Sequence, residues 1–270
     1  MIFPYTFVVK LSVITVNFNH KHFPKLSVEA LEKSVTDFDF EIIFVDNGST
    51  DPISLGFLER AAQEKRIQLF RSHRNLGFAG GNNLGVRHAT GDYFFILNPD
   101  TTVQEDTLQI LMDYIEQHPE IGILAPKLVY ADGRVQESCR RDMGFWDLVI
   151  KRTFLSETSW GRRRLQRYLM GDFHHDSTQE VELVTGAAML IPRKVYEEVG
   201  GFDDRYFLFM EDFDLCKEIR KAGYKVIYFP KALVNHYHKR LSGGNFLHLL
   251  FRKVFWLHIQ SATKYFWKWR

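Results

Sequence analysis

Two aspartates follow short apolar runs that have the composition of buried strands. Asp46 comes directly after the run EIIFV, and Asp100 comes three residues after the run YFFIL. Continuous apolar runs of this length are typical of strands buried on both faces of a parallel sheet. Parallel strands end on one edge of their sheet, where open α/β sheets bind ligands. The sequence therefore predicts two carboxylates along one groove, with Asp46 accepting a hydrogen bond from a nucleobase or ribose and Asp100 binding a metal ion.

Turn chemistry alone is an alternative interpretation of both aspartates. The sequence NPDT at 98–101 is a common turn that could precede a helix starting near Glu105 and cap it. The sequence DNGSTD at 46–51 could likewise be a strand-to-helix turn in which Ser49 or Asp51 caps the next helix. Each motif taken alone fits either interpretation.

Three acidic residues, Glu211, Asp212 and Asp214, open a predicted helix. The helix macrodipole favours acids in a first turn, and that effect alone would explain them. However, the run FLFM directly before them supplies apolar bulk that could raise the pKa of a carboxylate enough for general-base catalysis. His236 follows the last predicted strand and is a candidate third metal ligand, although a lone histidine there is more often a hydrogen-bonded surface residue.

The elements that must position these residues alternate between strands and helices. This order requires parallel strand pairs with right-handed crossovers. Residues 140–176 show poor periodicity and are interpreted as a variable insert, and no Pro/Gly/Ser-rich linker divides the chain, which favours a single domain. Strands are predicted at 10–16, 41–45, 67–70, 93–97, 121–128, 181–191 and 225–229, and helices at 26–35, 53–65, 105–117 and 211–222, with shorter helices before Gly91 and from Arg193.

The composition is that of an ordinary globular chain, with 45% hydrophobic and 25% charged residues among 270. A formal net charge of +2 argues against nucleic acid as the main partner. Cys139 and Cys216 lie far apart without metal-ligand spacing, so we expect neither a disulfide framework nor a zinc site, and a cytosolic location. We also expect no membrane span and no signal peptide, because the apolar runs are too short and the N-terminus lacks a basic start.

A glycine-rich stretch, RNLGFAGGNN at 74–83, runs into a predicted helix. It superficially resembles a dinucleotide-binding fingerprint. Its spacing is not G-x-G-x-x-G, and it does not follow the first strand, so it is weak evidence for NAD.

Four motifs in order identify a family resemblance. They are VDNGSTD, RNLGFAGGNN followed by GDYFFILNPDT, VTGAAMLIPRKVYEEVGGFDDRYFLFMEDFDLCKEIRKAGYKV, and NHYH. Together they closely resemble the family 2 glycosyltransferases of the GT-A fold, especially the bacterial rhamnosyltransferase-like members, over residues 10–238. The resemblance implies an α/β fold with a mostly parallel sheet flanked by helices, in one domain at 1–240. The nucleotide-sugar-binding half would lie at 10–130, the acceptor and catalytic half at 180–240, and a C-terminal helical extension at 241–270.

The resemblance also implies a role for each matching residue. Asp212 matches the family's general base, with Glu211 beside it on the acceptor side. Asp100 matches the last acid of the D-x-D element, and His236 matches a metal-binding histidine. Residues that match the donor-binding positions are Asp46, which would hold the base, and Arg74, Asn75, Gly77, Asn82, Asn98 and Gly186. Asn98 replaces the first acid of D-x-D, which leaves one charged metal contact fewer.

The activity implied by the resemblance is an inverting sugar transfer that depends on Mg²⁺ or Mn²⁺. The donor would be a nucleoside-diphosphate sugar, with rhamnose as a candidate, and the acceptor a glycan or polyprenyl-linked glycan of a bacterial surface polysaccharide. One alternative is a nucleotide-sugar-binding protein without transferase activity, which would lack the base that Asp212 supplies. Another is a sugar nucleotidyltransferase, which would carry a glycine-rich basic signature after its first strand, where this chain has NFNH.

The stretch 246–270 interleaves Phe, Trp and Tyr with Lys, Arg and His. This pattern suits helices that lie in a lipid interface, so we expect peripheral association with the inner leaflet of the cytoplasmic membrane. The alternative is that these aromatic residues pack back onto the catalytic domain or form a homodimer interface.

Overall fold

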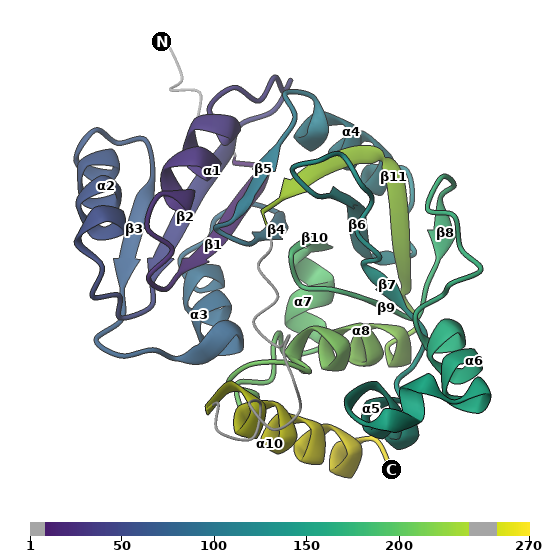
Figure 1. The fold of residues 1–270 in the computed structure, drawn as a ribbon. Coiled ribbons are helices and arrows are strands. Elements are labelled where there is room, and N and C mark those ends of the chain that lie inside the picture. The colour runs from purple at the N-terminus through teal and green to yellow at the C-terminus, as the bar shows by residue number, and fades with distance from the viewer. Residues whose placement is uncertain (1–8, 238–252) are drawn as a thin grey trace.

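The apolar runs form central strands because successive side chains point to opposite faces of a sheet. In β4 (Tyr93–Leu97), Phe95 and Leu97 enter the core on one face, and Phe94 and Ile96 enter the core on the other. A continuous apolar run is therefore buried on both faces, as predicted. Figure 1 shows this computed structural model, which describes residues 9–237 and 253–270.

The main sheet has the order β3-β2-β1-β4-β10-β6-β11-β5, with β8 (Gln179–Glu180) also paired to β11. Its first half is parallel and contains β1 (Leu11–Asn17), β2 (Phe40–Asp46), β3 (Gln68–Arg71) and β4. In its second half β10 (Ala188–Pro192) runs antiparallel to both β4 and β6 (Ile121–Val129). The remaining strands are β11 (Lys225–His236), parallel to β6, and β5 (Thr101–Val103), antiparallel to the end of β11.

Helices cover both faces of this sheet (Figure 1). One face carries α1 (Phe23–Leu31), α2 (Pro52–Gln63) and α4 (Thr107–Glu116). The other face carries α3 (Gly77–Val86), α7 (Arg193–Glu198) and α8 (Glu211–Lys221). The predicted α/β fold is confirmed, with a parallel first half and a mixed second half of the sheet.

The prediction of one continuous strand at 181–191 is wrong. The chain forms β9 (Leu183–Val184), which pairs with β7 (Cys139–Arg140) in a small second sheet, and then β10 in the main sheet. Both pieces are apolar and buried, so the sequence does not reveal that the pairing partner changes between them. The strand predicted at 225–229 in fact continues to His236 through a register shift between Phe229 and Leu233. Pro230 lies in this irregular stretch, where its missing N–H is tolerated.

The predicted insert at 140–176 folds into helices rather than irregular chain. It contains α5 (Phe145–Arg152), a 3₁₀ turn at Phe154–Glu157 and α6 (Ser159–Tyr168). These helices share a third hydrophobic cluster with α10 (Lys253–Lys268) and with the segment before α8. Figure 1 shows α5, α6 and α10 gathered on the same side of the molecule, next to α8.

Part of the predicted C-terminal extension therefore packs on the domain. Ala262 and Tyr265 of α10 are buried, and Ser261 Oγ donates to the Leu208 carbonyl at 2.9 Å. Residues 241–252 of that extension lie outside the described residues. Within residues 9–237 and 253–270, none of the helices combines the length and apolar character needed to cross a bilayer.

The turn that starts α3 makes a close contact with the segment before α8. Gly77 has φ of +78°, and a Cβ added there would lie 2.2 Å from the carbonyl oxygen of Phe207. That carbonyl accepts a hydrogen bond from the backbone N–H of Phe78 at 3.0 Å. The absence of a side chain at Gly77 thus lets the glycine-rich turn touch the chain that leads into Glu211.

We predict that Gly77→Ala destabilises the protein more than Gly133→Ala. Gly133 has nearly the same φ, +80°, but open space where a Cβ would be, so both variants carry the same left-handed strain. Only Gly77→Ala adds overpacking, which lowers the free energy of unfolding by about 1–3 kcal/mol. Each kcal/mol lowers the melting temperature by roughly 2–4 °C. Thermal unfolding of both variants measures the difference. Equal losses would show that the contact with Phe207 imposes no constraint.

Candidate active site

The predicted site residues gather at one edge of the main sheet. Asp46 ends β2 and is the register partner of Asn17, which ends β1. Asp100 follows the end of β4, and His236 ends β11. β1, β2 and β4 are parallel, and β11 runs parallel to β6, which has the direction of β4 because β10 is antiparallel to both. The expectation that Asp46 and Asp100 share an edge is confirmed.

Asp46 is a buried carboxylate with polar neighbours. The Asn17 side-chain amide donates to Asp46 Oδ1 at 3.4 Å, and Arg71 Nε lies 3.9 Å from Oδ2. The same amide of Asn17 donates to Ser49 Oγ at 3.1 Å, which ties the ends of β1 and β2 together. An ionised carboxylate has about four acceptor positions. Asp46 therefore keeps acceptor capacity for a ligand at this edge.

Asn47, which the sequence analysis did not single out, holds the glycine-rich turn. Its amide nitrogen donates to Asn75 Oδ1 at 3.1 Å and to the Gly77 carbonyl at 2.9 Å, and its Oδ1 accepts from Leu76 N–H at 2.9 Å. Asn75 Oδ1 also accepts from Gly77 N–H at 2.8 Å. Two of the predicted donor-binding residues, Asn75 and Gly77, are thus part of a hydrogen-bonded turn fixed beside Asp46.

The other predicted donor-binding residues differ in their surroundings. Arg74 is exposed on the glycine-rich turn, whereas Asn82 is buried in α3 with its amide donating to the Phe78 carbonyl at 2.9 Å. Asn98 donates its backbone N–H to the Ala187 carbonyl at 2.9 Å, which places it opposite the start of β10. Gly186 lies between the Phe78 ring and the acidic start of α8: a Cβ added there would lie 3.1 Å from Phe78 Cζ and 3.3 Å from Asp212 Cβ.

The predicted metal ligands lie side by side. Asp100 Oδ1 and His236 Nε2 are 3.5 Å apart, with side chains 13% and 7% exposed. His236 Nδ1 faces Gln136 Oε1 at 2.9 Å, while the Gln136 amide nitrogen donates to the His236 carbonyl at 3.0 Å. Since Gln136 Oε1 can only accept, Nδ1–H donates to it, and Nε2 faces Asp100. Burial by itself would raise the pKa of Asp100, but the hydrogen bond and charge of His236 outweigh it and lower that pKa.

Gln136 was missed by the sequence analysis because it lies outside every recognised motif. It is buried in the turn after β6, and its backbone N–H donates to the Leu128 carbonyl at 2.8 Å. Among the residues that the structure describes, no group of three or more His, Cys, Asp or Glu side chains could hold a metal ion unaided. Asp100 and His236 together supply one carboxylate and one imidazole, which suit Mn²⁺ when a substrate supplies further oxygen ligands.

Glu211 and Asp212 begin α8 in largely apolar surroundings. Asp212 Oδ2 accepts from the Gly186 N–H at 3.0 Å, and Oδ1 accepts from the Phe213 N–H at 2.9 Å. Glu211 is 5% exposed, and its Oε2 has no hydrogen-bond partner among the described residues. Burial is the main cause that raises the pKa of both carboxyls, and the charge of Asp212 raises the pKa of Glu211 further. The prediction that apolar surroundings raise the pKa of a carboxyl here is confirmed in direction.

The backbone before these acids is strained. Phe209 and Met210 both adopt left-handed conformations, with φ of +70° and +73°. Such conformations persist in non-glycine residues only where surrounding contacts impose them, and they are frequent at functional sites. Arg140 of β7 is also close enough to Asp212 for its positive charge to lower the pKa of that carboxyl. The sequence analysis missed Arg140 because it lies in the insert.

Comparison with known proteins identifies the family. The family model for Glycosyl transferase family 2 matches residues 12–200, which include the donor-side motifs and Gly186. The chain belongs to glycosyl transferase family 2. The predicted family is therefore confirmed.

Two curated proteins are similar along most of this chain. N-acetylglucosaminyl-diphospho-decaprenol L-rhamnosyltransferase from Mycobacterium tuberculosis is 29% identical over 224 residues, covering 77% of this chain and 70% of the relative. Rhamnosyltransferase WbbL from Escherichia coli is 26% identical over 262 residues, covering 94% of this chain and 91% of the relative. The similarity to WbbL thus extends beyond the residues that the family model matches.

A solved structure confirms the fold of this family member. GalNAc-T7, crystallised with UDP, GalNAc and Mn²⁺, superposes with a TM-score of 0.64 at 18% sequence identity. The match covers 85% of this chain, and the chain spans 44% of GalNAc-T7. At this identity the similarity establishes the GT-A architecture alone.

We predict that Glu211→Gln stabilises the protein at alkaline pH. An acid whose pKa is raised on folding binds its proton more strongly in the folded state, so stability falls as pH rises from about 4.3, the ordinary glutamate value, toward the raised folded-state pKa. A neutral amide removes this loss and the repulsion with Asp212. The difference between the melting temperatures at pH 5 and pH 8 should be smaller for Glu211→Gln than for the native chain. At pH 8 the variant should melt a few degrees higher than the native chain.

The matched control is Glu180→Gln, which changes an exposed glutamate on β8 and should leave the pH dependence unaltered. A Glu211→Gln variant that is less stable than the native chain at pH 8 would contradict the prediction.

Proposed function

We propose that this chain is an inverting, metal-dependent glycosyltransferase. It transfers a sugar, with rhamnose as the candidate, from a nucleoside diphosphate to a glycan or polyprenyl-linked acceptor of a bacterial surface polysaccharide. The observation that carries the proposal is the position of Asp212, a carboxylate with a raised pKa that is oriented by the Gly186 N–H. The two rhamnosyltransferase relatives support the sugar and the lipid-linked acceptor.

Asp212 is proposed as the general base. A carboxyl whose pKa is raised by burial is a better proton acceptor for an acceptor hydroxyl than an exposed aspartate. The hydrogen bonds from Gly186 and Phe213 fix its plane without neutralising it. One base on the acceptor side is sufficient for in-line displacement, which inverts the anomeric centre. A retaining hydrolase would instead need two carboxyl groups across the bond.

The donor is proposed to lie along the sheet edge, with its base at Asp46 and its sugar approaching Gly186. Asp46 accepts from the base or ribose, while the turn that Asn47 holds through Asn75 and Gly77 forms the adjoining wall, with Arg74 exposed on it and Asn82 behind it. Asn98 follows β4 beside Asp100 and contributes an uncharged side chain where the family has an acid. In-line displacement would then require the departing diphosphate and Asp212 to lie on opposite sides of the reacting carbon.

Asp100 and His236 would hold the divalent cation, with Gln136 fixing the imidazole tautomer. When bound, Mg²⁺ or Mn²⁺ offsets the negative charge of the departing diphosphate. The Mn²⁺ present with UDP in the related GalNAc-T7 fold supports this role.

The location proposed for the chain is the cytoplasmic face of the membrane, as a peripheral protein. A polyprenyl-linked acceptor would be presented there, and α10 together with the residues before it carries aromatic and basic side chains. A homodimer through the same helix is the alternative.

We predict that Asp212→Asn lowers turnover by about 10²–10⁴-fold, the usual range for loss of general-base catalysis. Donor affinity should stay nearly unchanged, because Asn keeps the shape and an acceptor oxygen for Gly186. Release of nucleoside diphosphate measures turnover, and calorimetry measures donor binding. Asp204→Asn, an exposed change in the loop before α8, is the control. Normal turnover with weakened donor binding would make Asp212 a ligand rather than the base.

We predict that Gln136→Leu weakens Mn²⁺ binding by about 10–100-fold, the usual effect of losing a hydrogen bond to a metal-ligating histidine. The substitution removes the acceptor that holds the proton on His236 Nδ1. Titration followed by the electron paramagnetic resonance of free Mn²⁺, with nucleoside diphosphate present, measures the affinity. Arg134→Ala alters the same turn at an exposed ion pair and should bind Mn²⁺ normally. Unchanged affinity in a folded Gln136→Leu variant would remove His236 from the metal site.

A further inference from the structure

We propose that the insert and α10 together form one surface that docks onto an anionic lipid bilayer. The surface consists of α5, the turn at Phe154–Glu157, α6 and the outer face of α10, and we call it the aromatic-basic face. This surface rests on the proposed membrane location and adds the insert to the C-terminal helix as a lipid contact.

The tryptophans of the chain are confined to this part of the molecule. All five lie in residues 140–176 or in α10 and the residue after it. Trp146 and Trp160 of the insert are 53% and 48% exposed, and Trp256 and Trp267 of α10 are 59% and 68% exposed. Phe154 is 77% exposed. Tryptophan favours the headgroup region of a bilayer, where its ring is buried in lipid and its N–H stays hydrated.

The exposed aromatic residues are continuous across the two segments. The ring of Phe145 in α5 packs on Phe266 of α10 at 5.9 Å and on Trp146 at 5.8 Å. Beneath them, Tyr168 and Leu148 of the insert share a buried cluster with Ala262 and Tyr265 of α10. The insert and α10 therefore pack together as one unit.

Helix α10 has a buried face and an exposed side. Ser261, Ala262 and Tyr265 form its buried face. Trp256 and Trp267 are eleven residues apart, about three turns, so they project from one side of the helix. That side lies roughly opposite the buried face.

The charge distribution favours anionic lipid over a second copy of the chain. Residues 140–176 and 253–270 contain 12 of the 35 Lys and Arg residues but 5 of the 33 Asp and Glu residues. These segments thus have a net charge of +7, and the remainder of the chain has −5, although the total is only +2. Arg162, Arg163 and Arg167 are exposed on α6. A two-fold dimer through this face would oppose two surfaces of the same charge, whereas anionic headgroups would attract it.

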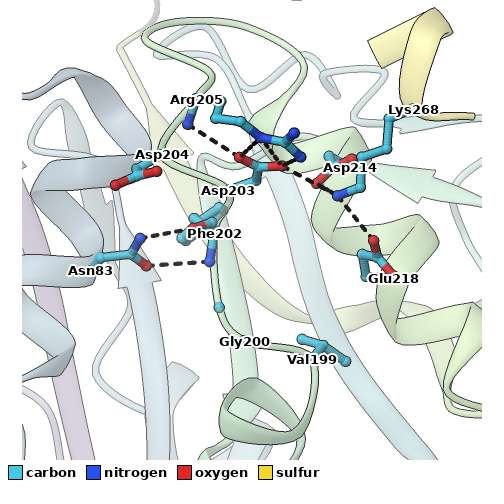
Figure 2. A pocket seen from close by; sticks show the side chains of 11 residues that line it. Asn83, Val199, Gly200, Phe202, Asp203, Asp204, Arg205, Asp214, Glu218 and Lys268 are labelled. Carbon is cyan, nitrogen blue, oxygen red and sulfur yellow. Dashed lines mark hydrogen bonds and ion pairs between the residues drawn. The ribbon is translucent and has the colours of Figure 1, made fainter. Parts of the chain in front are cut away.

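The aromatic-basic face is also joined to the proposed base. Lys268 Nζ and Trp269 Nε1 each contact the buried carboxylate of Asp214 at 2.7 Å, two residues after Asp212 in α8. Figure 2 shows Lys268 reaching from α10 to Asp214 and Glu218. These three residues, with Asp203 and Arg205, line a pocket of about 420 Å³. Docking through this face would hold the acceptor side of the proposed active site close to the lipid surface.

The test is co-sedimentation of the full chain with vesicles of phosphatidylcholine alone or mixed with phosphatidylglycerol. The native chain should pellet with the mixed vesicles and less at high salt. Phe154→Ser in the insert and Trp267→Ser in α10 should each weaken binding by about tenfold. In a variant with both Arg162→Gln and Arg163→Gln, each lost charge should weaken binding by about fivefold. Ile53→Ser, an exposed change on α2, should bind normally. Thermal unfolding confirms that each variant is folded.

Normal binding by the folded Phe154→Ser and arginine variants would overturn the role of the insert. Equal binding to neutral vesicles, or none to either kind, would overturn the lipid assignment. A dimer in analytical ultracentrifugation that Trp267→Ser dissociates would assign the face to a second copy. The assay contains neither donor nor acceptor, so its outcome is separate from that of the proposed transfer activity.

Discussion

The removal from water of two adjacent carboxyls, the buried Glu211 and the half-buried Asp212, is the constraint to which much of this structure responds. Removing a carboxylate from water is costly unless it is hydrogen-bonded or protonated, and the raised pKa values of both groups record that cost. The Gly186 N–H offsets part of it at Asp212. The left-handed Phe209 and Met210 turn the chain so that the acids enter the interior at the start of α8. That position is favourable because the helix macrodipole stabilises negative charge there.

The sequence was sufficient for those parts of the site that depend on local patterns. Asp46 and Asp100 follow apolar runs whose burial on both faces requires a parallel sheet, and such a sheet brings its strand ends to one edge. Contacts between residues from distant segments of the chain could not be predicted in this way. The apolar stretch around Gly186 gives no sign that β9 and β10 belong to different sheets, and Gln136 reaches His236 across 100 residues of sequence. Such contacts follow from how the strands stack, which no short window of sequence contains.

The C-terminal segment illustrates why the two interpretations of an amphipathic helix need not exclude each other. Tyr265 and Ala262 are buried against the insert and the segment before α8, as a helix that packs on its domain requires. Trp256 and Trp267 remain exposed on its other side. A helix has two sides about 180° apart, so one can hold the domain while the other meets a partner.

The start of α8 is therefore held from two directions. Positions two apart on a helix point to nearly opposite sides, so Asp212 faces the turn at Gly186 while Asp214 faces α10. Burial raises the pKa of Asp214 even though Lys268 and Trp269 of α10 donate to it. Tyr206, in the segment before α8, is a third donor, at 3.3 Å. Loss of α10 would leave that charge without the first two donors. The start of α8 thus contacts, through Asp214, a helix that the family model does not include, because the match ends at residue 200 and α10 begins at Lys253.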